Sequence, residues 1–320
     1  MSKRFDRAVD GILLLDKPQG MSSNTALQRA RGAFRALKAG HAGSLDPLAT
    51  GMLPICFGQA TKVCGYLLNS RKSYRVAVRL GVKTDSADAD GAVIERRDVP
   101  AFDVVRLDEV LNSFRGAQQQ IPPMYSALKQ DGRRLYELAR SGVTVERAPR
   151  DIVIERIALL GFAADRIEFE VRCSKGTYVR SLAEDIAARL GTVGHVTMLR
   201  RTQVEPFDPG RMVTLESLAD RDPAELDALL LPSDTALADL PSLSLDATRA
   251  VELFQGKPVT GVGETSIGLW RAYGPAEASA GASGRFLGIV RADGQGGIRA
   301  ERLFVPSATS GAESGAVSGA

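Results

Sequence analysis

Asp46 lies in the most unusual stretch of this 320-residue chain, a glycine- and proline-containing segment over residues 41–54. It is the only acidic residue of that segment, and Pro47 follows it. A proline disfavours the α-region for the residue before it, so we expect an extended backbone at Asp46. The nearby glycines allow tight turns or close approach of the backbone to a ligand. A carboxylate presented in this way can act as a nucleophile or a base if it stays ionised.

The charge around Asp46 is strongly basic. Residues 1–80 carry 13 Lys or Arg against 4 Asp or Glu, and residues 51–80 contain five basic residues and no acidic one. Nearby cations are expected to lower the pKa of Asp46. Residues 211–250 have the opposite balance, with 3 basic and 8 acidic residues. This asymmetry favours a polyanionic partner at the basic end. A solvated basic face explains the charge equally well, and an isolated Asp-Pro pair is usually a turn cap.

The three cysteines, Cys56, Cys64 and Cys173, do not indicate a metal centre. Their number is odd, their spacing is not that of a metal site, and only His41 and His195 could join them. We interpret them as reduced and mostly buried thiols. Residues 1–10 are polar and charged, and the apolar run at residues 12–15 is too short for a signal-peptide core or a membrane span. These features predict a cytoplasmic protein.

The segments that must position Asp46 mix strand and helix patterns, which predicts an α+β fold with a mixed or antiparallel sheet and inserted helices. Glycine, proline and capping residues set the expected limits of the elements. Strands are expected at residues 11–16, 73–80, 151–162, 166–174 and 194–204, and helices at 22–37, 58–68, 107–114, 133–140 and 178–190. Residues 84–91, with three aspartates, are expected to form a loop.

The C-terminal third has a different character. Residues 286–290 and 298–305 flank an Asp/Gly-rich turn and predict a hairpin. The division that we expect is a catalytic domain over residues 1–205, a connector completing it over 206–246, and a small β-rich domain over 247–306. Residues 274–284 are predicted to be a flexible inserted loop, and residues 307–320 a disordered tail.

Six ordered segments resemble the TruB family of tRNA pseudouridine synthases, which are bacterial enzymes acting on the T-loop uridine numbered 55. Residues 41–54 are similar to the family's catalytic loop, and residues 11–23 to its N-terminal signature. Ser73-Tyr74-Arg75 matches the segment with its active-site tyrosine. The other matches are residues 121–129, 173–182 and 195–201. The resemblance implies a pseudouridine-synthase-like catalytic domain, and weakly implies that the C-terminal domain is PUA-like and binds RNA.

The resemblance also assigns roles to individual residues. Asp46 falls on the nucleophile, which acts at the ribose of a flipped uridine by covalent addition at C1′ or by proton removal at C2′. Tyr74 falls on the aromatic that stacks on the target base, and Arg180 on the arginine paired with the catalytic carboxylate, a pairing that we expect to be bidentate. Tyr178 and Leu199 fall on the lining of the base pocket. His41 falls on a histidine that packs into the T-loop.

The residues taken alone have simpler explanations. Tyr74 and Leu199 are typical core residues, and Tyr178 and Arg180 could belong to an ordinary helix N-terminus. In its glycine-rich loop, His41 is expected at the surface. Four basic residues could contact phosphates or lie on a solvated face; these are Lys17, Lys62, Arg200 and Arg201.

The implied function is the isomerisation of uridine 55 of tRNA to pseudouridine. It requires no metal and no organic cofactor, because the reaction includes neither a redox step nor a hydrolysis. The expected partner is the T-arm of tRNA, with no membrane and no guide RNA, and the expected state is a monomer. One alternative is a tRNA-binding or tRNA-folding factor, an activity that could coexist with catalysis. Another is a guide-RNA-dependent relative within a multiprotein particle.

Overall fold

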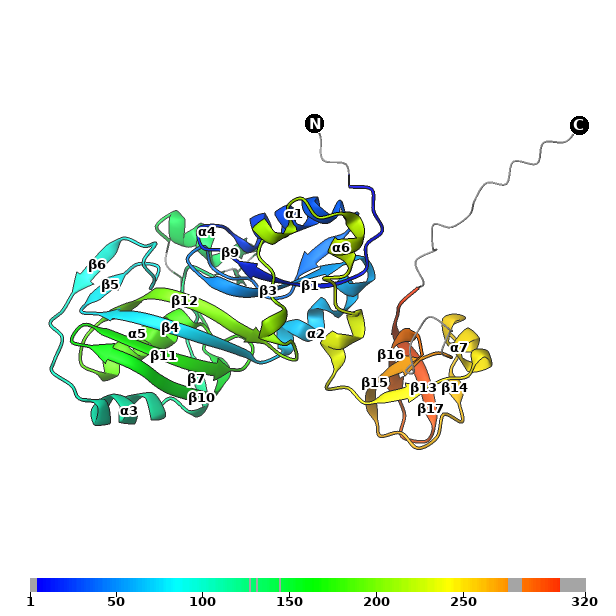
Figure 1. Cartoon of the computed structure of the whole chain (residues 1–320). Coiled ribbons are helices and arrows are strands. Elements are labelled where there is room, and N and C mark those ends of the chain that lie inside the picture. Colours follow the sequence, from blue (N-terminus) through cyan, green and yellow to red (C-terminus); the bar gives the residue numbers. More distant parts are fainter. Residues whose placement is uncertain (1–4, 127, 131, 144, 276–283, 306–320) are drawn as a thin grey trace, which may run out of the picture. The chain divides into compact units, whose positions relative to one another are not determined.

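The computed structural model describes residues 5–126, 128–130, 132–143, 145–275 and 284–305 (Figure 1). The chain divides into two compact units, Met1–Ala236 and Leu237–Ala320. The domain limits expected after residues 205 and 246 stay predictions. The expected tail at residues 307–320 and residues 276–283 of the expected insertion lie outside the described residues.

A mixed eight-stranded sheet forms the centre of the first unit (Figure 1). Its strand β12 runs parallel to β3, whereas the other neighbouring strands are antiparallel. The strands follow the order β1 (Gly11–Lys17), β3 (Thr50–Phe57), β12 (Gly194–Val204), β4 (Lys72–Leu80), β11 (Arg166–Cys173), β10 (Arg150–Ala163) and β7 (Gly116–Gln120), and β2 (Ala39–His41) also pairs with β3. The predicted α+β fold with a mixed sheet and inserted helices is confirmed.

Three helices pack against this sheet. Helix α5 (Val179–Arg189) contacts β12 and β4, α1 (Ser23–Phe34) contacts β2 and β3, and α3 (Val104–Asn112) contacts β10 and α5. The Ser22 hydroxyl caps α1 by accepting from the Thr25 backbone N–H at 3.1 Å. Arg35 adopts the left-handed conformation with φ 51°, which ends α1 before the predicted residue 37.

The predicted helix over residues 58–68 is two elements, a 3₁₀ turn η1 (Gly58–Val63) followed by α2 (Cys64–Asn69). Gly58 has φ +52°, and the Asp10 carboxylate accepts from the Gln59 N–H beside it. A standard α-helical start at residue 58 is therefore excluded. Lys72 caps the end of α2, because its Nζ donates to the carbonyls of Leu67, Leu68 and Ser70 at 3.1, 3.0 and 2.7 Å.

Shorter elements complete the first unit. The predicted helix over 133–140 begins with a strand residue pair, β9 (Arg133–Arg134), before α4 (Leu135–Arg140). The remaining elements are β5 (Val82–Thr84), β6 (Val93–Arg96), β8 (Lys129–Gln130), η2 (Pro209–Arg211), η3 (Glu216–Leu218), α6 (Pro223–Asp227) and η4 (Ser233–Leu237), which ends in the second unit.

The second unit is a small five-stranded sheet with one helix, α7 (Ala247–Phe254). Its strands follow the order β13 (Ser242–Ser244), β15 (Gly268–Tyr273), β16 (Phe286–Ala292), β17 (Gly297–Leu303) and β14 (Val259–Thr260). The predicted hairpin is the antiparallel pair β16–β17. Leu253 of α7 packs into a core with Val290 and Ile298. Within the described residues of the whole chain, every helix is too short or too polar to cross a bilayer.

Candidate active site

Asp46 lies on a loop, residues 42–49, that joins the paired strands β2 and β3. The Ala42 N–H donates to the Pro54 carbonyl at 3.0 Å and closes the base of the loop. At its tip, the Ala49 N–H donates to the Asp46 carbonyl at 3.1 Å. The loop therefore contains a tight turn that begins at Asp46, and the strand pair fixes both of its ends.

The segment from β1 to α1 holds one side of this loop. The Ser23 hydroxyl is buried and exchanges two hydrogen bonds with the backbone of Leu45, at 2.7 and 3.0 Å. The Gly20 N–H donates to the Pro47 carbonyl at 2.9 Å. Lys17 is fully buried, and its Nζ donates to the carbonyls of Met21 and Pro47 at 2.8 and 3.5 Å. Burial lowers the pKa of Lys17 to about 8.

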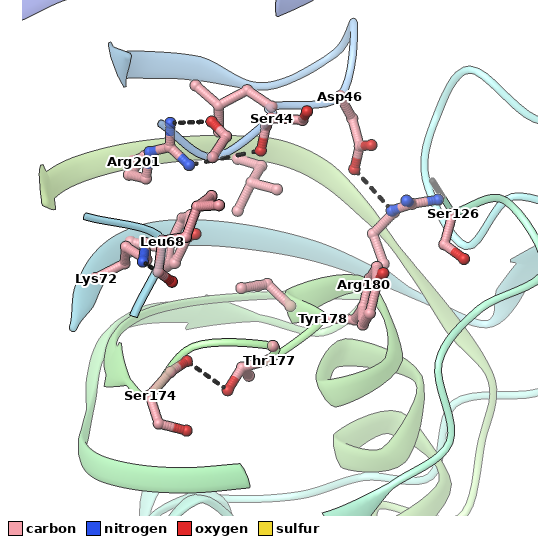
Figure 2. A pocket seen from close by; sticks show the side chains of 16 residues that line it. Ser44, Asp46, Leu68, Lys72, Ser126, Ser174, Thr177, Tyr178, Arg180 and Arg201 are labelled. Carbon is pink, nitrogen blue, oxygen red and sulfur yellow. Dashed lines mark hydrogen bonds and ion pairs between the residues drawn. The ribbon is translucent and has the colours of Figure 1, made fainter. Parts of the chain in front are cut away.

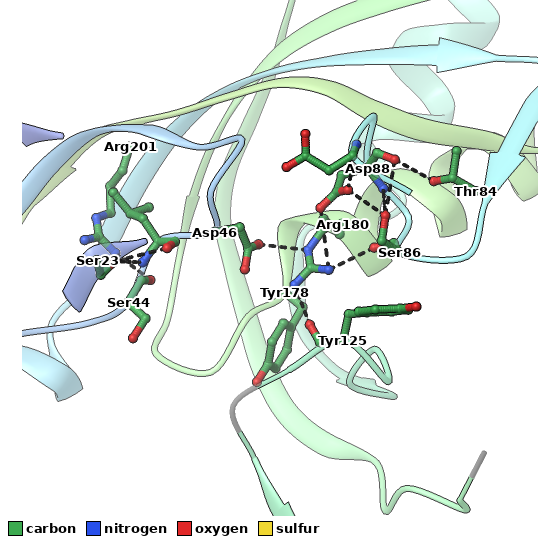
Figure 3. Close-up of polar contacts among 12 residues, drawn as sticks. Ser23, Ser44, Asp46, Thr84, Ser86, Asp88, Tyr125, Tyr178, Arg180 and Arg201 are labelled. Atoms are coloured by element: carbon green, nitrogen blue, oxygen red, sulfur yellow. Dashed lines mark hydrogen bonds and ion pairs between the residues drawn. The ribbon is translucent and has the colours of Figure 1, made fainter. Parts of the chain in front are cut away.

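Arg201 of β12 holds the other side (Figures 2 and 3). Its side chain is buried, and the guanidinium donates to the carbonyls of Met52, Gly43 and Ser44 at 2.7, 2.9 and 3.5 Å. It thus joins the first half of the loop to strand β3. The prediction that Lys17 and Arg201 contact phosphates or lie on a solvated face is wrong. Both side chains are buried, and backbone carbonyls accept their hydrogen bonds.

Arg180, in the first turn of α5, contacts the Asp46 carboxylate (Figure 3). Its Nε lies 2.9 Å from Asp46 Oδ2. Its other two nitrogens donate to the carbonyls of Ser86 at 2.8 Å and Tyr125 at 2.7 Å. The expected pairing is confirmed in identity, but it is not bidentate, because backbone carbonyls occupy the rest of the guanidinium.

A second carboxylate, Asp88, lies on the far side of Arg180 (Figure 3). It is buried, and its Oδ2 is 3.7 Å from Arg180 Nη1. Its Oδ1 accepts from the Ser86 hydroxyl at 2.6 Å and from the Asp90 N–H at 3.1 Å. One buried arginine is therefore shared between two carboxylates.

The pKa of the Asp46 carboxyl is raised above its usual range, mainly by burial. Arg180 and Lys17 oppose this effect, and the negative charge of Asp88 reinforces it. The cations lower this pKa as expected, but removal of the carboxylate from water outweighs them, so the pKa rises overall. The side chain is still 39% exposed, so the carboxylate remains open to the cavity in front of it.

That cavity has a volume of about 320 Å³ and brings together five of the six predicted site residues (Figure 2). They are Asp46, Tyr74, Tyr178, Arg180 and Leu199. Tyr74 comes from β4 and Leu199 from β12, so the sheet supplies one wall and the Asp46 loop and α5 supply others. Burial raises the pKa of the Tyr74 hydroxyl, and the neighbouring Arg201 guanidinium opposes that rise.

Tyr178 directly precedes α5. Its backbone is held by Gln120, the last residue of the edge strand β7. The buried Gln120 side chain accepts from the Tyr178 N–H at 2.8 Å and donates to the Tyr178 carbonyl at 3.0 Å. This pair of bonds fixes the backbone at the start of α5. It explains how Tyr178 and Arg180, two residues apart, both line the same cavity.

His41 lies on β2, at the entrance to the Asp46 loop, and is not part of the cavity lining. It is half-buried, which corrects the expectation of a surface histidine. Its Nδ1 is buried without a hydrogen-bond partner, and burial lowers its pKa. Of the other basic candidates, Arg200 pairs with Asp16 at 2.9 and 2.7 Å, and Lys62 donates to the Gln59 side chain.

Asp88, Gln120, Ser86 and Tyr125 were not among the residues predicted for the site. The sequence signals were the aspartate-rich loop at 84–91 and the segment preceding Pro122 and Pro123, but neither signal indicates contact with Arg180 or Tyr178. Among the described residues, no group of three or more His, Cys, Asp or Glu side chains is placed to hold a metal ion.

Two family models match adjoining parts of the chain. The N-terminal domain of TruB family pseudouridylate synthases matches residues 31–179, and the C-terminal domain of tRNA pseudouridylate synthase B matches residues 180–238. A tRNA pseudouridine synthase B from Chromohalobacter salexigens is 47% identical over 304 residues, which are 94% of this chain and 96% of that protein. One from Stutzerimonas stutzeri is 47% identical over 306 residues, 94% of this chain and 98% of that protein.

Solved structures agree on the fold. A crystal structure of a Cbf5-Nop10-Gar1 complex contains a chain that matches with a TM-score of 0.69 and 22% identity, covering 93% of this chain and 84% of that one. A chain of the archaeal box H/ACA sRNP Nop10-Cbf5 complex matches with a TM-score of 0.66 and 21% identity, covering 95% and 90%. At this level of identity the likeness concerns the fold alone.

Proposed function

Because the chain belongs to the TruB family of pseudouridylate synthases and isomerises uridine to pseudouridine in tRNA, we propose that its target is uridine 55 of the T-loop and that Asp46 is its nucleophile. The observation that carries the proposal is the contact between Asp46 and the buried Arg180 at the wall of an open cavity. Of the two carboxylates next to Arg180, Asp46 lines the cavity, whereas Asp88 lies behind the arginine.

The cavity suits a base taken out of its stack. Its volume of about 320 Å³ lies at the small end of the range for ligand pockets, roughly 300–1,000 Å³. Extrusion of a nucleotide costs roughly a few kcal/mol, and stacking on an aromatic side chain recovers part of it. We assign this stacking to Tyr74, and we assign contacts along the edge of the base to Tyr178 and Leu199.

Asp46 then acts at the ribose. Addition of the carboxylate to C1′ and removal of the C2′ proton both need the ionised form, and both release uracil from the sugar. Arg180 stabilises that form and holds its direction, since three of its nitrogens are bonded to three different partners. The released uracil turns within the cavity and rejoins the sugar through C5, after which the C5 proton is removed. We assign assistance in that step to the Tyr74 hydroxyl.

We also propose that the enzyme works on free tRNA as a monomer, without a guide RNA, in the cytoplasm where tRNA is found. Relatives that are 47% identical over 94% of the chain carry the name of a tRNA enzyme. His41, with its unpartnered buried nitrogen at the loop entrance, is assigned to contact the T-loop.

Formation of pseudouridine on an unmodified tRNA transcript, mapped to the nucleotide with wild type and Asp46→Asn side by side, tests the proposal. We expect product at uridine 55 from the purified wild-type protein alone. Asp46→Asn should form no product and should keep its affinity for tRNA, since the amide retains the shape but not the charge.

Three other results would contradict parts of this proposal. Turnover by Asp46→Asn would remove Asp46 from the role of nucleophile. Product at another uridine would refute the assigned position. Binding without turnover by the wild type would favour a requirement for a guide or partner, or the tRNA-folding interpretation.

A further inference from the structure

Cys56 and Cys64 lie next to each other behind the Asp46 loop. Cys56 is on β3 and fully buried, whereas Cys64 is the first residue of α2 and is half-buried. The two thiols are close enough for each to shift the pKa of the other. Cys173 is not part of the pair; its thiol lies at the end of β11 and contacts the Lys72 carbonyl at 3.8 Å.

Gly40 of β2 lies beside this pair. Gly40 lies directly opposite Cys56 in the β2–β3 register. A Cβ atom at position 40 would lie 3.8 Å from Cys64 Sγ, so the Cys64 side chain occupies the space beside the glycine. Residues directly opposite in an antiparallel pair carry their side chains on the same face. The Cys56 side chain therefore lies on the same face of the β2–β3 pair that Cys64 Sγ approaches at Gly40.

The two thiols differ in their chemistry. The pKa of Cys64 is lowered mainly by its interaction with Cys56; burial opposes this effect, and the charge of Lys38 adds to it weakly. The same interaction, together with burial, raises the pKa of Cys56. Cysteines that react with oxidants have low pKa values, are accessible, and often lie next to a second thiol. Cys64 is half-buried and its pKa is lowered, and Cys56 lies beside it as the second thiol.

We propose that Cys64 is an oxidation site for hydroperoxides and that Cys56 is its resolving thiol. In the first step the Cys64 thiolate attacks a peroxide oxygen, the O–O bond breaks, and Cys64 sulfenic acid and hydroxide form. In the second step the Cys56 sulfur displaces hydroxide from the sulfenic acid, and the lost proton completes a water molecule. The net reaction oxidises two thiols to one disulfide and reduces one hydrogen peroxide to two waters.

Oxidation of this cysteine pair would affect the strands that carry the Asp46 loop. Strands β2 and β3 are the two ends of the loop that carries Asp46. Further oxidation of Cys64 would place a sulfinate or sulfonate against that strand pair, and this damage is irreversible without a dedicated enzyme. A disulfide joins two residues that already touch and can be reduced again. We therefore expect the disulfide to preserve the site and the unresolved sulfinate to damage it.

Hydrogen peroxide is the probe for this proposal, and the intact folded protein is the sample. Wild type should lose two free thiols, and its mass should fall by that of two hydrogens. Its peptide map should contain a Cys56–Cys64 disulfide, and its activity should stay within about two-fold of that of the untreated enzyme. Brief treatment with peroxide and dimedone should label Cys64 and leave Cys173 unlabelled. The control Cys173→Ser should form the same disulfide. Cys64→Ser should lose thiols at least about ten-fold more slowly.

Cys56→Ala should convert Cys64 to sulfinic and sulfonic acid and lose activity irreversibly. The dimedone measurement uses wild type only, so it decides the reactive residue even if a variant at the buried Cys56 does not fold. Sulfinic acid at Cys64 of wild type without a disulfide would overturn the proposal, and so would preferential oxidation of Cys173 or an unchanged rate in Cys64→Ser.

Discussion

Asp46 carries its charge in surroundings that disfavour it. Burial raises its pKa, and the nearby Asp88 acts in the same direction, while Arg180 opposes both. The folded state therefore holds the Asp46 proton more tightly than the unfolded state does, and the ionisation of Asp46 subtracts from stability as pH rises through the normal carboxyl range. A site residue that weakens the fold is better explained by catalysis than by structure.

The pH dependence of turnover should show this raised pKa. In the proposed mechanism the carboxylate is the active form, so single-turnover activity should fall as pH decreases through the pKa of Asp46. We expect the midpoint of this acid limb to lie above about 3.9, the ordinary value for an aspartate. Single-turnover rates on saturating tRNA, measured from pH 4 to 8, give the midpoint.

Asp88→Asn should move that midpoint to lower pH. It removes a negative charge that raises the pKa of Asp46 and leaves the charge of Arg180 undivided. The maximal rate should also fall, by roughly ten-fold or more, because Asp88 helps to fix the guanidinium. Asp90→Asn is the matched control, since the Asp90 side chain is exposed and only its N–H bonds to Asp88. A midpoint that moved to higher pH would contradict the shared-arginine arrangement.

At this scale the sequence located the proposed site residues better than it described their environment. Asp46, Tyr74 and Arg180 were found through ordered motifs, and all three line the cavity. The sequence did not predict the burial of Lys17 and Arg201. Both side chains bond to carbonyls of segments far away in sequence, and no local pattern indicates those contacts. Asp88 was visible only as one of three aspartates in a loop.

At the scale of elements, the junction of β3 and β12 decides where the Asp46 loop lies. Gly51 of β3 pairs with Arg201 of β12 in the parallel part of the sheet. Its φ is +99°, and a Cβ at this position would lie 2.2 Å from the Arg201 carbonyl oxygen. Only glycine allows the two strands to approach so closely while the Arg201 side chain reaches back to the loop.

Gly51→Ala should therefore be strongly destabilising. Strained backbone and forced separation of the strands together are expected to cost roughly 2–4 kcal/mol of unfolding free energy. Chemical denaturation with urea measures this cost. Gly65→Ala is the control, because no atom lies within 4 Å of its Cβ position and helix α2 favours alanine. Equal stability of the two variants would show that the junction tolerates a side chain.

Strand patterns predicted five of the eight strands of the main sheet and missed β2, β3 and β7, whereas helix patterns located α1, α3, α4 and α5. Some differences in element limits come from contacts of single residues. Residues 58–63 form a 3₁₀ turn because Gly58 has a positive φ and Asp10, far away in sequence, binds the next N–H. Residues 133–134 pair with β8 before α4 begins. The periodicity of apolar residues does not report either of these backbone contacts.

At the scale of the whole molecule, the exposed basic residues that can bind tRNA are distinct from the buried arginine at the proposed site of the chemical step. Several cations of residues 1–80 are paired within the protein, such as Arg35 with Asp6 and Arg75 with Glu168, but these pairs are partly exposed to solvent. The Arg180 guanidinium is buried and bonded to Asp46 and to two backbone carbonyls. Salt screens exposed charges strongly and buried pairs weakly. Binding of tRNA and conversion of the bound uridine should therefore respond differently to ionic strength.

We expect the Kd for tRNA to rise at least about ten-fold between 50 and 200 mM monovalent salt, since each neutralised phosphate releases counterions. The rate constant for conversion of bound tRNA should change by less than about two-fold over the same range. Lys175 is exposed and adjoins Ser174 and Gly176 of the cavity wall, so Lys175→Ala should make the logarithmic salt slope of binding shallower. Filter binding and single-turnover kinetics on the same samples measure the two quantities. A conversion rate that fell in parallel with the affinity for tRNA would mean that exposed charges act in the chemical step. That result would contradict the prediction that salt affects binding but not conversion.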